Sequence, residues 1–180
     1  MAGEFAIEPA RPEDAAALAE IYAHHVLHGT ATFETVPPDA AEMAARLKRV
    51  LDAGWPWLVA RDGDGGVLGY AYATQFRDRP AYAFAAEDSI YIRHDLRGRG
   101  IGKALLTALI AEAERFGFRQ LLGVIGGGEP ASIALHAACG FVHRGRMEAM
   151  GRKHGRWLPT VYMQLALGDG DTTPPPFEPQ

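Results

Sequence analysis

"DLRGRGIGKALL", residues 95–106, places three glycines and three basic residues directly before an apolar run. Leu105, Leu109 and Ala113 fall on one face at helical spacing, which predicts a helix over residues 101–118. Backbone N–H groups at a helix start have no partner within the helix, and the helix dipole favours an anion there. The segment is therefore predicted to be a phosphate-binding turn.

Three nucleotide-binding patterns compete for this turn. A phosphate loop of the Walker type needs glycine at Arg97 and a hydroxyl residue at Ala104, so it fails twice. A dinucleotide fingerprint needs its third glycine at Lys103. The third pattern, Arg/Gln-x-x-Gly-x-Gly/Ala between a strand and a helix, matches at each specified position. The alternative to all three is a glycine-rich turn with solvated arginines.

The third pattern resembles the pyrophosphate loop of the GNAT superfamily, the acyl-CoA-dependent N-acyltransferases. The resemblance implies acetyl-CoA as co-substrate and no metal. It also implies that a strand around "SIYI" meets the pantetheine arm through its backbone, which supplies an oxyanion donor. The implied cofactor-binding residues are Ile90, Tyr91, Ile92, Arg97, Gly98, Arg99, Gly100, Ile101, Gly102, Lys103 and Ser132.

More narrowly, the chain resembles acetyltransferases of phosphinothricin and of methionine sulfone and sulfoximine. The matching segments are "HGTATFET", "FRDRPAY", "EDSIYI", "GVIG", "SIALH" and "KHGRWLPTVYMQ". The resemblance implies a small-molecule amine substrate of amino-acid type, and a homodimer. Two alternatives stay open: an acetyltransferase for another small amine or a peptide N-terminus, and a non-catalytic acyl-CoA sensor.

Glu87, just before "SIYI", resembles the glutamate that this family uses as general base. A carboxylate can do this if partial desolvation raises its pKa. Asp88 is its local rival, and a surface acid is the alternative reading. His136 resembles a family histidine that assists proton transfer, although a packing role is equally compatible with the sequence. Phe141 stands where tyrosine is common, so no general acid is assigned.

The substrate of such an enzyme needs cationic and polar partners, and arginine suits oxygen-rich groups. The predicted substrate-binding residues are Phe33, Arg77, Arg79, Tyr82 and Lys153. Solvated loop charge is the alternative reading for the arginines. Two departures from the family pattern matter: Glu129 replaces an asparagine that helps to hold the pantetheine arm, and Ala83 replaces a larger polar residue.

The rest of the chain predicts an α/β fold around a mixed sheet, in the order β α α β β β α β α β β. The resemblance implies a single GNAT domain, residues 1–167, with a mostly antiparallel sheet whose middle strands are splayed. Residues 168–180, "GDGDTTPPPFEPQ", are predicted to be a disordered tail. Asp39 is a predicted helix cap, Gly140 a predicted helix end, and residues 76–88 a predicted loop or short helix.

Composition limits the classes of function. The 180 residues carry a formal net charge of −4, so no overall basic field indicates nucleic acid. No apolar run approaches the ~20 residues that a membrane span needs. The single cysteine, Cys139, fits a reducing, cytoplasmic setting, and no signal peptide is recognised at the N-terminus. His24 and His28 have metal-binding spacing, but no further ligand completes a site.

Overall fold

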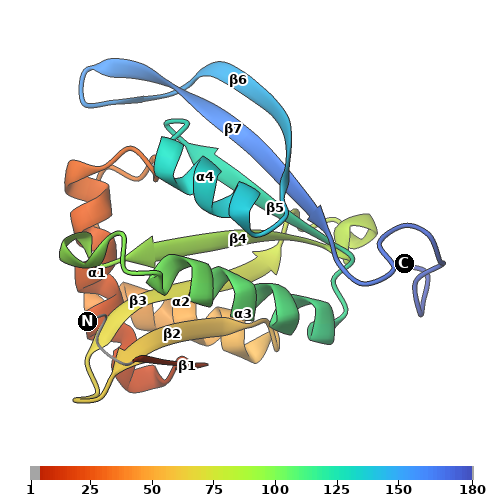
Figure 1. Ribbon diagram of the computed structural model, residues 1–180, viewed down its shortest axis with the longest axis horizontal. Helices are drawn as coiled ribbons and strands as arrows, with labels where there is room; N and C mark the ends of the chain where they lie inside the picture. The colour runs from red at the N-terminus through yellow and green to blue at the C-terminus, as the bar shows by residue number, and fades with distance from the viewer. Residues whose placement is uncertain (1–4, 180) are drawn as a thin grey trace.

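The computed structural model describes residues 5–179, and its elements follow the predicted order (Figure 1). The strands are β1 (Phe5–Pro9), β2 (Trp57–Asp62), β3 (Val67–Gln75), β4 (Ala85–Ile92), β5 (Gln120–Gly126), β6 (Val142–Lys153) and β7 (Arg156–Ala166). The helices are α1 (Ala15–His28), α2 (Ala40–Asp52), α3 (Ile101–Phe116) and α4 (Pro130–Ala138).

One mixed sheet holds all seven strands in the order β1-β2-β3-β4-β5-β7-β6. β4 and β5 run parallel, and the other neighbours are antiparallel. The β4–β5 pairing ends where Asp88 meets Gly123, although β4 continues to Ile92 and β5 to Gly126. The two strands therefore diverge along their second halves, as the resemblance implied.

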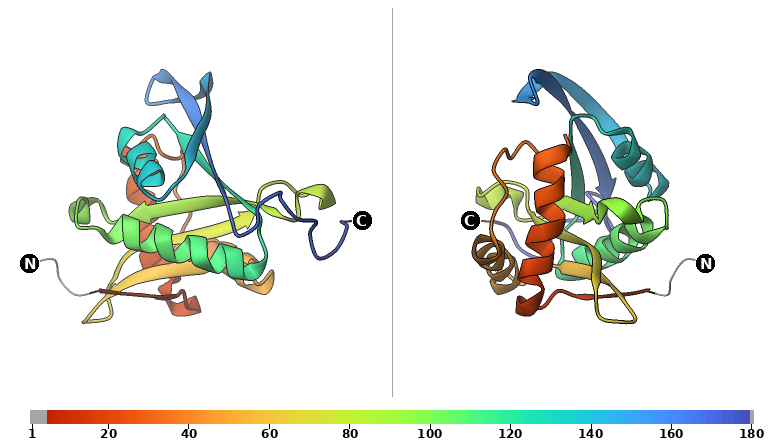
Figure 2. Two further views of the ribbon diagram at one scale, coloured as in Figure 1. Left: turned by 45° about the vertical axis from the view of Figure 1, so that its right-hand side comes forward. Right: turned by 90° about the vertical axis from the view of Figure 1, so that its left-hand side faces the viewer.

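The sheet separates two helical layers, with α3 and α4 on one face and α1 and α2 on the other (Figure 2). Each layer closes one apolar core. Leu105 and Leu109 of α3 are fully buried in the first core, and Leu18 and Leu47 of α1 and α2 in the second. The helical spacing of Leu105, Leu109 and Ala113 in the sequence therefore identifies the buried face of α3 correctly.

Local signals explain where several helices begin and end. The Asp39 side chain accepts a hydrogen bond from the Glu42 backbone N–H and caps α2, which confirms that prediction. Gly117 ends α3 with a φ of 114°, a left-handed conformation that favours glycine. Gly140 follows α4 with a φ of 93°, as predicted.

β4 begins earlier than the sequence suggested. Residues 76–88 were expected to form a loop or short helix, but the strand already starts at Ala85. Small and acidic residues are weak strand formers. They are extended here because β4 is a central strand, paired with β3 on one side and β5 on the other. Glu87 and Asp88 consequently lie inside a strand rather than ahead of one.

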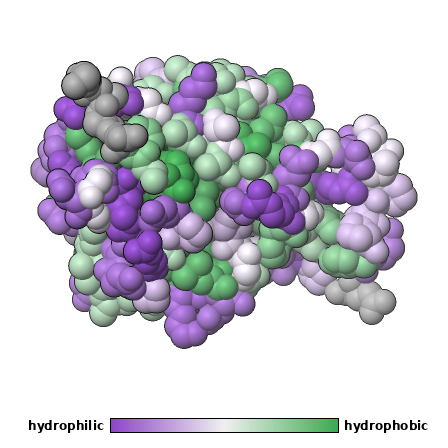
Figure 3. All heavy atoms as spheres, turned by 60° about the horizontal axis from the view of Figure 1, so that its bottom comes forward, coloured by the Kyte–Doolittle hydropathy of each residue, from purple (hydrophilic) through white to green (hydrophobic). Residues whose placement is uncertain are grey.

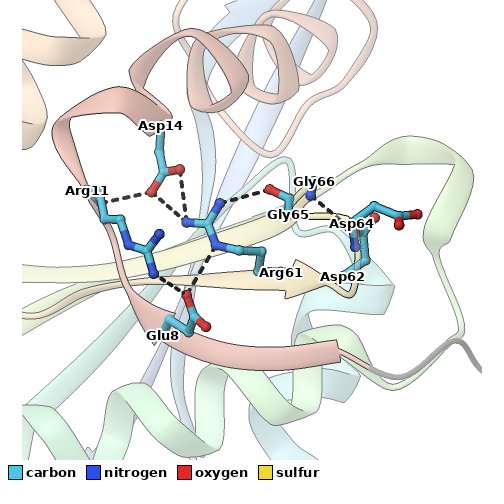
Figure 4. Close-up of polar contacts among 8 residues, drawn as sticks. All are labelled: Glu8, Arg11, Asp14, Arg61, Asp62, Asp64, Gly65 and Gly66. Carbon is cyan, nitrogen blue, oxygen red and sulfur yellow. Dashed lines mark hydrogen bonds and ion pairs between the residues drawn. The ribbon is translucent and has the colours of Figure 1, made fainter.

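A partly buried ion-pair network ties β1 to β2 and to the start of α1 (Figure 4). The Arg61 guanidinium donates to both carboxylate oxygens of Asp14 at 3.0 Å and to Glu8 at 3.2 Å. Arg11 donates a backbone N–H to Asp14 and its guanidinium to Glu8. Because every charge has a partner, burying Asp14 leaves no uncompensated carboxylate.

The two ends of the sheet differ. Around β1, the surface mixes hydrophilic and hydrophobic residues (Figure 3). At the other end, the β6–β7 hairpin rises away from the body (Figure 1). Residues 168–179 contain turns, and Arg119 donates hydrogen bonds to Gly170, Thr173 and Pro174. Disorder of residues 168–180 stays a prediction. The hydrogen bonds from Arg119 argue against it for residues 170–174.

Candidate active site

Two adjoining pockets lie where β4 and β5 diverge. The smaller, of about 240 Å³, is lined by both strands, by the loop after α1 and by α4. The larger, of about 370 Å³, extends along β4 to the glycine turn before α3. Ala31, Ile90, Tyr91 and Ser132 line both. The divergence of two central strands thus creates one continuous site that reaches from the middle of the sheet to a helix N-terminus.

The glycine turn forms the outer end of the larger pocket. Gly98 and Gly100 have φ values of 77° and 82°, which favour glycine, and a Cβ at either would meet no atom within 4 Å. The turn therefore needs glycine for its backbone shape and not for space. No side chain caps α3, so its first N–H groups stay free to donate to an anion.

All of the predicted cofactor-binding residues line this larger pocket: Ile90, Tyr91, Ile92, Arg97, Gly98, Arg99, Gly100, Ile101, Gly102, Lys103 and Ser132. The structure thus brings together residues from β4, the turn and α4. Three of them, Arg97, Arg99 and Lys103, are exposed cations beside the uncapped helix start. This arrangement has the chemistry of a binding site for a pyrophosphate or a similar anion.

This pocket also contains a histidine that the sequence did not indicate. His25 of α1 is buried, lines the larger pocket, and places Nε2 2.8 Å from the backbone carbonyl of Ile92. Its neighbour His24 stacks on His94 with ring centroids 3.9 Å apart. Spacing alone suggested a metal pair at His24 and His28, and nothing in it could indicate a partner on β4.

Glu87 lies in the smaller pocket, as predicted. Burial, the largest cause, and the neighbouring Asp88 charge raise the pKa of Glu87 from 4.5 to about 7, against the opposing effect of Arg77. A carboxyl group with a pKa near neutrality is suited to accept and return protons at physiological pH.

His136 also lines the smaller pocket, but both of its ring nitrogens have partners. Nε2 lies 3.0 Å from Asp88 Oδ1, and Nδ1 lies 2.7 Å from the Ser132 carbonyl oxygen. Gly123 of β5 makes room for the ring, since a Cβ there would come within 2.7 Å of His136 Cδ2. Asp88, predicted as a rival to Glu87, lines the same pocket and is the partner of His136.

Glu87 and Asp88 point to opposite faces of the sheet. β4 pairs Glu87 with Thr74 and Asp88 with Ala73, which lies in the core beneath α3 and α4. Side chains alternate along a strand, so Glu87 faces the α1–α2 layer and Asp88 the α3–α4 layer. The smaller pocket therefore meets Glu87 from one side of the sheet, and Asp88 with His136 from the other.

The predicted substrate-binding residues are divided by the structure. Phe33 lines the smaller pocket and packs so closely on Gly151 that a Cβ there would approach its ring to 2.6 Å. Arg77, Arg79 and Tyr82 line neither pocket. They are exposed on the loop before β4, where Arg77 lies over the Phe76 ring and Tyr82 packs against its edge.

Lys153 occupies a different place from the one expected. It is buried, and Nζ donates a hydrogen bond of 2.8 Å to the Thr32 carbonyl oxygen. Neither of the two adjoining pockets is lined by Lys153. It joins "KHGRW" to "HGTATFET", the segments that carry much of the resemblance. The sequence showed both motifs but could not show that they touch.

Further contacts fix this loop between α1 and α2. Tyr22 bonds to Thr32 Oγ1 at 2.8 Å and donates to Glu34, which also holds Arg46. Glu129, where the family pattern has asparagine, accepts a 2.6 Å hydrogen bond from Thr30. Glu129 thus gains a local partner at the rim of the larger pocket. The loop is held from several sides, so its pocket-lining residues are preorganised.

Within residues 5–179, no three His, Cys, Asp or Glu side chains come together as metal ligands would. No helix in that range combines the length and the hydropathy needed to cross a membrane.

Comparisons with known proteins agree with this geometry. Residues 18–141 match the family model described as Acetyltransferase (GNAT) family. Phosphinothricin N-acetyltransferase of Alcaligenes faecalis is 55% identical over 92% of this chain and 84% of its own length. L-methionine sulfoximine/L-methionine sulfone acetyltransferase of Pseudomonas aeruginosa is 38% identical over 93% of this chain and 98% of its own.

A solved structure is similar as well. The phosphinothricin acetyltransferase of Sinorhizobium meliloti, crystallised with acetyl-CoA, superposes with a TM-score of 0.94 at 49% identity. The match covers 97% of this chain and 95% of that one. The order of the elements, the diverging central strands, the glycine turn and these matches lead to one conclusion: the chain belongs to the GNAT family of acetyltransferases.

Proposed function

We propose that the protein transfers the acetyl group of acetyl-CoA to the primary amine of a small amino-acid-like molecule of the phosphinothricin, methionine sulfone or methionine sulfoximine type. One observation carries the proposal. The glycine turn with the uncapped start of α3 forms an anion cradle at one end of a continuous site between β4 and β5. Glu87, whose pKa is near 7, lies at the other end. The relatives act on such substrates by name, which supports the choice of substrate class.

In this proposal acetyl-CoA occupies the larger pocket. The pyrophosphate would bind the free N–H groups of α3 together with Arg97, Arg99 and Lys103. The pantetheine arm would follow the backbone of β4 from Ile92 toward Ile90, on the side from which β5 has diverged. This path would place the thioester where the two pockets join.

Glu87 is proposed as the general base in the smaller pocket. It would remove a proton from the substrate ammonium, directly or through water, so that the nitrogen lone pair can attack the thioester carbonyl carbon. The carbonyl oxygen would then become an oxyanion, which a backbone N–H of β4 would stabilise. Collapse of the tetrahedral intermediate would break the carbon–sulfur bond and release the CoA thiolate.

Two parts of the protein would recognise the substrate: an aromatic side chain inside the smaller pocket, and cationic side chains at its rim. Phe33 would form the wall, because it lines the pocket and is fixed against Gly151. Neither lysine nor arginine is among the residues that line the smaller pocket, so cations for an anionic substrate must reach in from the rim. Arg77 is the first candidate because it already influences Glu87, and Arg79 and Tyr82 lie on the same loop.

The protein is further proposed to be a cytoplasmic homodimer that pairs through the β6–β7 hairpin. β6 is an edge strand and is exposed along most of its length. Val142, Met147, Met150 and Trp157 are each more than half exposed there. Apolar side chains exposed along a hairpin at the end of a sheet are typical of a protein–protein interface. The single cysteine supports a reducing compartment.

The test is thiol release from acetyl-CoA, measured with phosphinothricin, methionine sulfone, methionine sulfoximine, free amino acids and a short peptide. We expect the highest kcat/KM with one of the first three. A preference for the peptide would replace the proposed substrate class. Binding of acetyl-CoA without thiol release from any amine would identify a sensor instead.

A further inference from the structure

We propose that the Ser132 hydroxyl gives the departing CoA thiolate its proton, and that His136, held by Asp88, resupplies Ser132. The proposal rests on the proposed function and assigns the general acid of that reaction. Family resemblance could not assign one, because Phe141 occupies the position where a tyrosine is common.

Ser132 has the required position. It is the α4 residue that lines both pockets at their junction, where the thioester sulfur is proposed to lie. Its Oγ is 3.4 Å from Nδ1 of His136, one helical turn further along. His136 Nε2 in turn lies 3.0 Å from Asp88 Oδ1. A hydroxyl at the pocket surface is thus connected to a buried imidazole and a buried carboxylate.

The contacts of His136 determine where its protons are. Nδ1 lies 2.7 Å from the Ser132 carbonyl oxygen, which can only accept, so Nδ1 carries a hydrogen. Nε2 lies against a carboxylate, which also favours a hydrogen between the two atoms. Burial lowers the pKa of His136, but the bond and charge of Asp88 outweigh it and raise that pKa overall. The two contacts therefore place a hydrogen on each ring nitrogen.

The two faces of the sheet separate this donor from Glu87. Asp88 and α4 lie on the α3–α4 face, together with Ile90 and Ile92 of the proposed pantetheine path. Glu87 lies on the other face, where the amine is proposed to bind. A base for the amine and an acid for the thiolate thus approach one reaction centre from opposite sides. Neither group has to serve both purposes within one turnover.

The proposed step is balanced. As the carbon–sulfur bond breaks, the Ser132 O–H bond breaks and an S–H bond forms. The Nδ1–H of His136, which both the Ser132 carbonyl oxygen and Oγ can accept, moves to Oγ at the same time, so no free alkoxide is formed. The neutral ring then faces the Ser132 carbonyl with a bare nitrogen, which favours prompt reprotonation from solvent. No oxidant, reductant or metal takes part.

The surroundings of His136 contain one charge that could alter its titration. Asp88 faces it from β4, Ser132 from its own helix and Gly123 from β5. Phe141 meets the ring edge to face, with centroids 4.9 Å apart. The pH dependence of the step should therefore follow the His136–Asp88 pair.

The test compares Ser132→Ala with Ser132→Thr, which keeps the hydroxyl. At saturating substrates, we expect Ser132→Ala to lower kcat about 10- to 100-fold. This is less than the largest effects of losing an acid–base group, because a thiolate can leave without much help from an acid. Ser132→Thr should retain most of kcat. The dissociation constant for CoA, measured by calorimetry, should change less than about threefold in both. The deficit of Ser132→Ala should shrink at high pH, where wild-type His136 has lost its proton.

Three results would overturn the proposal: Ser132→Ala keeps the wild-type kcat, its loss disappears at saturating acetyl-CoA, or its deficit is the same at every pH. His136→Gln gives a second check, since combined with Ser132→Ala it should lower kcat no further than Ser132→Ala alone. An additive double variant would also refute the relay. If the wild-type protein transfers no acetyl group at all, the proposed function is refuted. Failure of the Ser132 relay can therefore be told apart from failure of the proposed function.

Discussion

At the scale of single residues, Glu87 shows how burial produces chemistry. The carboxyl group lies inside a central strand at the point where that strand loses its partner. It is desolvated enough for its pKa to rise to about 7, yet it still borders a pocket that an amine can enter. The burial that makes Glu87 a suitable base also means that its ionised form lowers the stability of the folded state.

The first prediction concerns the rate. Glu87→Gln should lower kcat/KM for the amine by about 100- to 10,000-fold, the range for a general base. In wild type, kcat/KM should rise with pH through an inflection near 7, because the base must be unprotonated. That inflection should be absent from the variant. Asp78→Asn, which removes an exposed acid of the neighbouring loop, is the matched control and should retain both rate and profile.

The second prediction concerns stability. Because the pKa of Glu87 is about 7 when folded and near 4.5 when unfolded, the folded state binds the proton more tightly. Glu87 therefore costs stability as pH rises from about 4.5 to 7, by about 3 kcal/mol once it is fully ionised. Glu87→Gln should raise the free energy of unfolding at pH 8 and change it little at pH 4. Urea denaturation at both pH values tests this; equal effects would contradict it.

At the scale of elements, the loop between α1 and α2 is held by three other parts of the fold. Tyr22 of α1 bonds to Thr32, Glu129 at the start of α4 bonds to Thr30, and Lys153 at the end of β6 bonds to Thr32 O. These contacts set the position of Phe33 in the pocket. Lys153 thus contacts the loop that carries Phe33 and lines neither of the two adjoining pockets.

The third prediction separates a role of Lys153 through this loop from direct contact with the substrate. Lys153→Met should raise KM for the amine about tenfold, the effect of losing ~1.4 kcal/mol of binding, and leave KM for acetyl-CoA within about threefold. The rise should be similar for phosphinothricin, which has an anionic head, and for methionine sulfone, whose head is neutral. A direct anchor would affect the anionic substrate far more, and that outcome would contradict the loop role. Lys48→Met, at an exposed position on α2, is the control.

The sequence predicted the order of the elements, the glycine turn and the buried face of α3, because these depend on local patterns. It also placed Glu87 and Phe33 in the site through resemblance. It missed the strand at residues 85–88, where partners on both sides override weak propensity. The pairing of Asp88 with His136, 48 residues apart, and of Lys153 with Thr32 arises only when distant segments fold together.

At the scale of the whole molecule, the sheet separates two helical layers and has an opening at its centre, where β4 and β5 diverge. Its α3–α4 side carries the anion cradle and the Ser132–His136–Asp88 group, and its α1–α2 side carries Glu87. Divergence of β4 and β5 lets the two sides act on one point. The hairpin of β6 and β7 extends this sheet outward (Figure 2). Apolar side chains of both strands of the hairpin are more than half exposed.

The fourth prediction concerns assembly. Wild type should elute with twice the 19.5 kDa mass of one chain when measured by light scattering. Met147→Glu combined with Trp157→Glu should shift it toward a single chain, because charges at a packed apolar interface oppose association. Leu51→Glu on α2, also partly exposed, should leave the mass unchanged. A wild-type monomer would contradict the proposed homodimer.

The central claim, direct transfer of an acetyl group to an amine, is tested most directly by product stoichiometry. Wild type is incubated with acetyl-CoA and methionine sulfone, and free thiol and N-acetylated product are measured together by mass spectrometry. The account predicts equal amounts of the two and no acetylated protein. Thiol without N-acetyl product, or bound acetyl-CoA with neither product, would contradict it.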